Sequence, residues 1–163
     1  MVMNEIAGDI EIEFDAPTPV TFSELYSHEF VPLVRLATLM TSRPEAARDI
    51  VQDAFVKLHV KWATVDNPAA YVRRSVVNGC KSLHRREGRR RRDDSLAEQA
   101  AHLEIDHTLA TLGCLNHRQR AVVVLKYYEE RTEAEIAAIV GCRSGSVGPT
   151  LQRALAKLRD NQS

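Results

Sequence analysis

The sequence has few aromatic residues and no long apolar run, and both absences narrow the kinds of protein it can encode. Aromatic residues make up 6% of its 163 residues. No apolar stretch approaches the roughly 20 residues that a membrane-spanning helix needs. The acidic N-terminus is also unlike a secretory signal peptide, which begins with positive charge. We therefore expect a cytoplasmic protein of one domain or two small helical domains.

Motifs for metal binding and for common catalytic chemistry are missing as well. The three cysteines, Cys80, Cys114 and Cys142, form no CxxC pair, and no Cys/His spacing suits zinc. The six histidines form no HExxH motif, and no glycine-rich phosphate loop follows a strand. We expect no catalytic residue, no metal site and no cofactor. The cysteines are expected to be small buried apolar residues in a reducing compartment.

Net charge is zero, but positive charge is absent from one region and concentrated in another. Residues 1–20 contain five acidic residues and no Lys or Arg, whereas residues 71–92 contain nine Lys and Arg against Glu87 alone. Such asymmetry indicates nucleic acid bound by the basic part. A solvated charged face beside a flexible joint is the simpler alternative.

Apolar residues recur at steps of three and four, and no strand-like alternation occurs, which predicts an all-α protein. The charged stretch "REGRRRRDDSLAEQ" lacks apolar periodicity and predicts a joint between two helical bundles. The expected parts are a flexible acidic tail (1–20), a first bundle (21–87), a charged linker (88–106) and a second bundle (107–163).

Capping signals predict where the helices begin. The predicted caps are Ser42 with Glu45, Asn67 before Pro68, Asn116 with Gln119, and Thr132 with Glu135. The helix after Asn67 is expected to run from about Ala69 to Arg86, with Val72, Val76, Cys80 and Leu83 on its buried side.

Two polar stripes are predicted on the surface of the first bundle. Asp49, Gln52 and Asp53 share one face of the helix that begins at Glu45. On the next helix, Arg74, Asn78, Lys81 and Arg85 form a stripe at steps of four, three and four. Cations and an amide in this arrangement suit a phosphate backbone.

The stretch "EAEIAAIVGCRSGSVGPTLQRALAKLR" predicts a helix-turn-helix, with a short helix, a turn at Gly141 and a second amphipathic helix. Pro149 lies near the start of the second helix. If Ser146 is the cap, Pro149 is the third helical residue, where a missing N–H costs little. Thr150, Gln152, Arg153 and Lys157 are then predicted to face outward. A structural hairpin without DNA binding is the alternative.

These residues resemble the sigma factors of bacterial RNA polymerase. "EAARDIVQDAFVKLH" and "NPAAYVRRSVVNGCKSLHRR" are similar to their conserved region 2, and "LNHRQRAVVVLKYYEERTEAEIAAIVGCRSGSVGPTLQRALAKLR" is similar to their promoter-reading region 4. The order and separation of the blocks agree, and the small size resembles the extracytoplasmic-function group. The resemblance implies a non-enzymatic factor that binds the polymerase core and opens promoter DNA.

The resemblance also implies roles for particular residues. Asp49, Gln52 and Asp53 match the motif that docks on the polymerase. The residues expected at the melted −10 element are Lys57, Trp62, Arg73, Arg74, Asn78 and Lys81. Those expected at the −35 element are Lys126, Arg143, Ser146, Thr150, Gln152, Arg153 and Lys157. A lone Trp in a small bundle is more often a core residue than a base-stacking one.

The chain departs from the family pattern at two places. Val72 stands where the family often has Trp, and Gly148-Pro149-Thr150 replaces a segment that commonly carries two basic residues. Each lost phosphate contact should flatten the salt dependence of DNA binding by about one unit. We therefore expect weaker or altered −35 recognition.

The implied partners are the RNA polymerase core, promoter DNA and an anti-sigma protein, with no insertion into a membrane. A stand-alone helix-turn-helix regulator is the main alternative, although it would have no use for the face at Asp49, Gln52 and Asp53. A second alternative keeps the fold but has lost DNA reading, as Gly148 and Pro149 suggest.

Overall fold

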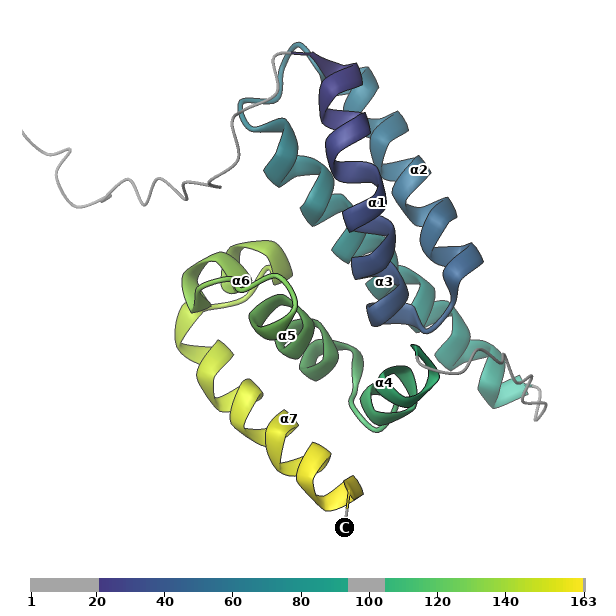
Figure 1. Cartoon of the computed structure of the whole chain (residues 1–163), viewed down its shortest axis with the longest axis vertical. Helices are drawn as coiled ribbons and strands as arrows, with labels where there is room; N and C mark the ends of the chain where they lie inside the picture. The colour runs from purple at the N-terminus through teal and green to yellow at the C-terminus, as the bar shows by residue number, and fades with distance from the viewer. Residues whose placement is uncertain (1–20, 94–104, 163) are drawn as a thin grey trace, which may run out of the picture.

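The computed structural model describes residues 21–93 and 105–162, and every element in them is a helix (Figure 1). The predicted all-α class is therefore confirmed. The elements are α1 (Phe22–Thr41), α2 (Pro44–Lys61), α3 (Pro68–Asp93), α4 (Ile105–Leu112), α5 (His117–Tyr127), α6 (Glu133–Val140), the 3₁₀ turn η1 (Ser144–Ser146) and α7 (Val147–Gln162). The predicted acidic tail and most of the predicted linker lie outside the described residues.

Helices α1, α2 and α3 form a first module in which each helix packs on the other two. Its core is made of the apolar stripes that the periodicity predicts, and Val72, Val76 and Cys80 of α3 are buried as expected. Leu83 is only half-buried. Gly79 allows the close approach of α2 and α3, because a Cβ atom there would lie 2.6 Å from Cγ2 of Ile50.

The second module contains α5, α6 and α7, with α4 against α7. Capping boxes begin α5 at Asn116 and α6 at Thr132, as predicted. Each cap side chain accepts a hydrogen bond from the backbone N–H three residues later, which satisfies a donor that the first helical turn leaves open. Gly141 ends α6 in the left-handed conformation, with φ of 76°.

Two predictions about helix ends were wrong. Ser42 does not cap α2: it ends α1 in the left-handed conformation, and the N-cap of α2 is Arg43, without a side-chain bond. Helix α3 continues to Asp93 rather than ending near Arg86, because Arg and Glu favour helix even without an apolar stripe. A capping box of Thr21 and Glu24 at the start of α1 was missed, although its Thr-x-x-Glu signature stands in the sequence.

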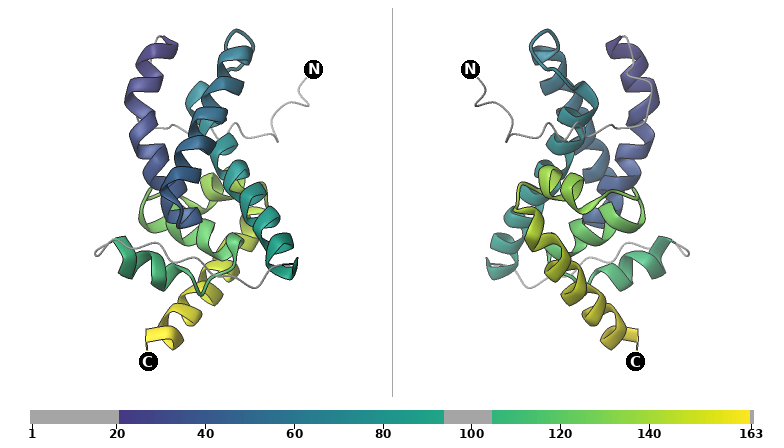
Figure 2. Two further views of the ribbon diagram at one scale, coloured as in Figure 1. Left: turned by 90° about the vertical axis from the view of Figure 1, so that its right-hand side faces the viewer. Right: turned by 90° about the vertical axis from the view of Figure 1, so that its left-hand side faces the viewer.

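The two modules pack directly against each other through α1 and α3 on one side and α5 and α6 on the other. Figure 1 shows α5 and α6 beside this pair, and Figure 2 shows the same closeness from two further sides. Buried residues of both modules belong to one hydrophobic cluster. The prediction of two helical bundles is correct, but they are not spatially separate in this arrangement.

Candidate polymerase and nucleic-acid interfaces

Helix α2 presents the predicted polar face to solvent. Asp49, Gln52 and Asp53 are all exposed, since the opposite side of the helix is used for packing. The buried residues of that opposite side are Ala47, Val51, Ala54, Phe55 and Leu58. Two carboxylates and one amide therefore lie together on a solvent-exposed face of α2 that takes no part in the packing of the core.

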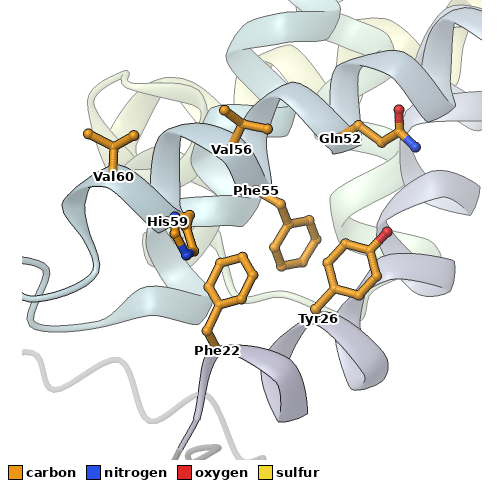
Figure 3. Close-up of a pocket in the computed structure, with 7 residues that line it drawn as sticks. All are labelled: Phe22, Tyr26, Gln52, Phe55, Val56, His59 and Val60. Carbon is orange, nitrogen blue, oxygen red and sulfur yellow. The ribbon is translucent and has the colours of Figure 1, made fainter.

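An apolar groove lies next to this polar face, between α1 and α2 (Figure 3). Its volume is about 380 Å³, and Gln52 forms part of its edge. Aromatic rings of Phe22 and Tyr26 contact Phe55 across the two helices, with ring centroids 6.0 and 4.9 Å apart. Val56 is 64% exposed and Val60 is 80% exposed, which is unusual for valine in a well-packed helix. An exposed apolar patch bordered by polar side chains is typical of a protein-binding face.

The cationic stripe of α3 is exposed as predicted. Arg74, Asn78, Lys81 and Arg85 all face solvent, and Lys57 on α2 is also exposed. This stripe offers several donors and positive charge along one side of the helix, which is what binding to a phosphate backbone requires.

Arg73 differs from its neighbours and from its prediction. Its side chain is only 6% exposed. It lies 3.0 Å from a carboxylate oxygen of Glu29 in α1 and 2.8 Å from one of Glu129, which follows α5. In this arrangement it cannot hold the phosphates of a DNA strand, because two carboxylates already occupy its guanidinium. Sequence spacing gave no sign of these partners, which lie 44 and 56 residues away.

Trp62 is half-buried and packs against the core, so the structure favours the alternative to base stacking. Its ring makes an edge-to-face contact with Phe22, with centroids 5.5 Å apart. This contact joins the end of α2 to the start of α1.

The helix-turn-helix consists of α6, the turn at Gly141, η1 and α7. Helix α7 begins at Val147, so Pro149 is its third residue and its missing N–H removes no bond within the helix. The 3₁₀ turn η1 comes directly before this helix and ends at Ser146. Pro149 is thus compatible with the second helix of the motif.

The outward face of α7 is largely as predicted, with one correction. Gln152, Arg153 and Lys157 are exposed, and so is Arg143 just before η1. Thr150 is 4% exposed, and its hydroxyl donates a hydrogen bond of 2.7 Å to the carbonyl of Ser146. The prediction that Thr150 faces outward was wrong because one turn of helix places it toward the core beside Val147.

Ser146 and Lys126 are less available than the fully exposed residues. The Ser146 hydroxyl accepts a hydrogen bond from Arg118 at 2.9 Å and donates one to the carbonyl of Arg143 at 2.7 Å. Lys126 is half-buried at the end of α5. The hydrogen bonds of Ser146 fix the geometry of η1, and hence the start of α7.

Arg120 joins the two modules at a second point, which the sequence did not reveal. Its Nε donates to the carbonyl of Leu39 and one terminal nitrogen donates to the Ser42 hydroxyl, both at 2.6 Å. Both acceptors lie at the end of α1, where a cation interacts favourably with the helix dipole. The Ser42 hydroxyl is therefore used by the other module rather than by α2.

Titratable groups at the same junction have shifted pKa values. Burial, together with the nearby positive charges of His84, Lys81 and Arg120, lowers the pKa of His117 to about 4. The rings of His84 and His117 are stacked, with their centroids 5.6 Å apart.

Burial raises the pKa of the Cys80 thiol to about 12, so this cysteine is a neutral core residue. Cys114 and Cys142 are half-buried.

Within the described ranges, no group of three His, Cys, Asp or Glu side chains is placed to hold a metal ion. In the same residues, no helix has the length and apolar character to cross a membrane.

Comparison with known proteins accounts for both modules. The family described as sigma-70 region 2 matches residues 25–90, and sigma-70 region 4 matches residues 108–158. The RNA polymerase sigma-E factor of Streptomyces coelicolor is 32% identical over 141 residues, which cover 78% of each protein. The chain belongs to the sigma-70 family. It is a sigma factor of the extracytoplasmic-function type.

Other relatives agree with this assignment. The sigma-E factor of Streptomyces antibioticus is 29% identical over 154 residues, covering 85% of this chain and 83% of that protein. CnrH, solved with the cytosolic domain of CnrY, superposes with a TM-score of 0.70 at 28% identity and covers 86% of each chain. RpoE of Bartonella quintana, solved with the anti-sigma factor NepR, has a TM-score of 0.70 over 85% of this chain and 94% of that one. At 24% identity, it supports the fold alone.

As a sigma factor, the chain binds the RNA polymerase core and directs transcription from promoters, and a stand-alone regulator is not favoured. Sigma factors are non-catalytic initiation factors.

Proposed function

We propose that this sigma factor docks on the polymerase core through the exposed face of Asp49, Gln52 and Asp53 together with the neighbouring apolar groove. The carboxylates and the amide supply directional bonds to basic groups of the partner. Val56 and Val60 supply apolar area, which a polar face alone lacks. The observation that carries this proposal is the joint exposure of both surfaces on α2.

Co-purification with core polymerase tests this docking site. Asp49→Arg combined with Asp53→Arg should abolish co-purification, because two attractive charges become repulsive while the buried side of α2 is untouched. The matched control is Glu130→Arg combined with Asp160→Arg, which changes the charge equally at exposed positions of the other module. Retention of core by the first variant would remove the docking assignment.

For promoter DNA, we propose two contact surfaces. Arg74, Asn78 and Lys81 of α3, aided by Lys57, hold the melted −10 strand by its phosphates. Gln152 and Arg153 of α7 read base edges of the −35 element, since Gln pairs with adenine and Arg with guanine in the major groove. Arg143 and Lys157 add phosphate contacts beside them. The exposure of these side chains supports the proposal.

The remaining parts of the proposal concern organisation and partners. Residues 21–87 and 107–163 act as the docking and −35 modules, joined by residues 88–106. The chain itself has no enzymatic activity, and it works in the cytoplasm because polymerase and chromosomal DNA are there. An anti-sigma protein is a further proposed partner, since the similar CnrH and RpoE structures were solved with CnrY and NepR.

A further inference from the structure

Helix α3 continues well past the part that packs in the first module. It has 26 residues, against 20 in α1 and 18 in α2. Up to Gly88, its last buried residue is Cys80, and a Cβ atom at Gly88 would meet nothing within 4 Å. Figure 1 shows the end of α3 running beyond the turn that joins α1 to α2. The packing of the core therefore does not explain the last turns of this helix.

This extension of α3 is strongly basic. From Lys81 to Arg92 the sequence has seven Lys and Arg residues and one acidic residue, Glu87. Glu87 is itself bound to Arg43, which precedes α2. Like charges three and four positions apart repel each other on a helix and destabilise it. A bound polyanion would remove this repulsion.

The helical repeat places some of these arginines in line with the cationic stripe. The exposed residues Arg74, Asn78, Lys81 and Arg85 are continued, at steps of four and three, by positions 89 and 92, which are both arginine. We call Arg85, Arg89 and Arg92 the distal row. Positions 86, 90 and 91 fall outside this line. Cys80, Leu83 and Glu87 lie on the opposite side of the helix, where they line a cavity shared with the second module. The distal row therefore belongs to the side of α3 that takes no part in packing.

The length and direction of α3 indicate which part of the promoter the distal row meets. The proposed −10 contacts end at Lys81, and the helix continues for roughly 16 Å from there to Arg92, the length of about five base pairs of duplex. The chain leads from this end of α3 to the module proposed to read the −35 element. The DNA nearest to the end of α3 is therefore the segment between the two elements.

We propose that the distal row binds the phosphate backbone of duplex DNA directly upstream of the −10 element. Duplex DNA carries one negative charge per about 1.7 Å of its axis, twice the density of a single strand, so closely spaced cations bind it more strongly. Contacts to phosphates add affinity and fix the position of the helix on the DNA without reading sequence. The inference rests on the proposed −10 role of α3.

The salt dependence of DNA binding by the full chain tests the distal row. The variant R85Q/R89Q/R92Q should reduce the slope of log affinity against log salt by about 2–3 units on a mixed-sequence duplex of about 20 base pairs, because each phosphate contact contributes about 0.9. The matched control R86Q/R90Q/R91Q removes the same charge from the same stretch and should reduce the slope by less than about one unit. Fluorescence anisotropy at several salt concentrations gives both values.

Two results would overturn the proposal: equal reductions for the two variants, or a larger loss of affinity for a single strand or an RNA of the same length than for the duplex. Glutamine has nearly the helix propensity of arginine, so circular dichroism should show the wild-type helical signal. If the triple variant loses helix, Arg85→Gln alone should reduce the slope by about one unit. No change for that variant would also count against the distal row.

Hydroxyl-radical footprinting with core polymerase places the contact on a promoter. The wild-type chain should protect the backbone directly upstream of the −10 element, and R85Q/R89Q/R92Q should lose this protection while R86Q/R90Q/R91Q keeps it. Full protection by the first variant would contradict the proposed position. If the wild-type chain with core polymerase gives no discrete start sites, the proposed function fails, whereas the salt dependence of the free chain still decides whether the distal row binds duplex phosphates.

Discussion

Individual side chains of α7 divide into those that face solvent and those that hold the helix in place. Gln152, Arg153 and Lys157 are exposed on the outer side of the helix. Thr150 and Val147 are buried and fix the first turn of the helix against the module. Changes in the two groups should therefore have separable effects on DNA binding and on stability.

Arg153→Ala should weaken discrimination at one base pair of the −35 element by about 1–3 kcal/mol, because a bidentate contact to guanine is lost. Fluorescence anisotropy with a −35 duplex and its single-base variants measures this difference. Arg35→Ala removes the same charge from an exposed position of α1 and should leave discrimination unchanged. Equal discrimination by wild type and Arg153→Ala would contradict the assignment.

Thr150→Val should lower the free energy of unfolding by about 1 kcal/mol, since the Ser146 carbonyl loses a buried donor. Discrimination between −35 sequences should not change, as the side chain does not reach solvent. Urea denaturation measures the first effect and anisotropy the second. Thr64→Val, which removes a similar bond in an exposed turn, serves as the stability control. A change in base preference would restore Thr150 as a DNA contact.

At the scale of helices, the pair α2–α3 positions both proposed surfaces of the first module. Helix α2 carries the docking face and α3 carries the cationic stripe, and they meet closely at Gly79 and Ile50. Their relative position therefore fixes the docking face with respect to the −10 strand.

Gly79→Ala should destabilise the protein by about 1–3 kcal/mol, because the added methyl group overlaps the Ile50 side chain and forces the helices apart. Chemical denaturation gives the measurement. Gly88→Ala is the matched control: a Cβ atom there meets nothing within 4 Å, and alanine favours helix, so stability should rise by about 0.5–1 kcal/mol. Similar effects of the two substitutions would contradict the close approach.

Structural features that depend on neighbouring residues could be predicted from the sequence. Features that depend on contacts between residues far apart in the sequence could not. The caps at Asn116 and Thr132 depend on residues three positions away, and both were found from the sequence. Ser42 and Glu45 have the same capping-box spacing, but the Ser42 hydroxyl accepts a hydrogen bond from Arg120, 78 residues later, instead of capping α2. The burial of Arg73 has the same origin, since its partners lie far away in sequence. Periodicity identified the exposed faces of α2 and α3, but not the contacts between modules.

At the scale of the whole molecule, the junction between the modules contains several groups of like charge. His117 of α5 faces His84 and Lys81 of α3 and lies near Arg120. The cavity of about 290 Å³ beside them is lined from both modules. A further positive charge at this junction should favour separation of the two modules.

Acidification should therefore open the molecule. The pKa of His117 is lowered to about 4 in the packed state by burial and by the nearby cations, whereas in an opened state it returns toward 6.5. Between pH 4 and pH 6.5, His117 therefore binds more protons in the open state than in the packed state. The free energy that favours the packed state is greatest above pH 6.5 and decreases as the pH falls toward 4. The radius of gyration should be larger at pH 5 than at pH 7.5. His117→Phe, which keeps a ring but cannot be charged, should reduce this dependence; an identical dependence would exclude His117 as its source.

The central claim is that one face of α2 delivers the polymerase to promoters that α3 and α7 recognise, and run-off transcription on a library of DNA fragments tests it most directly. Core polymerase with the wild-type chain should give discrete start sites, each preceded by common −35 and −10 sequences. Core polymerase with the Asp49→Arg, Asp53→Arg variant should give none. Absence of such sites with the wild-type chain, or the same sites with the variant, would contradict the account.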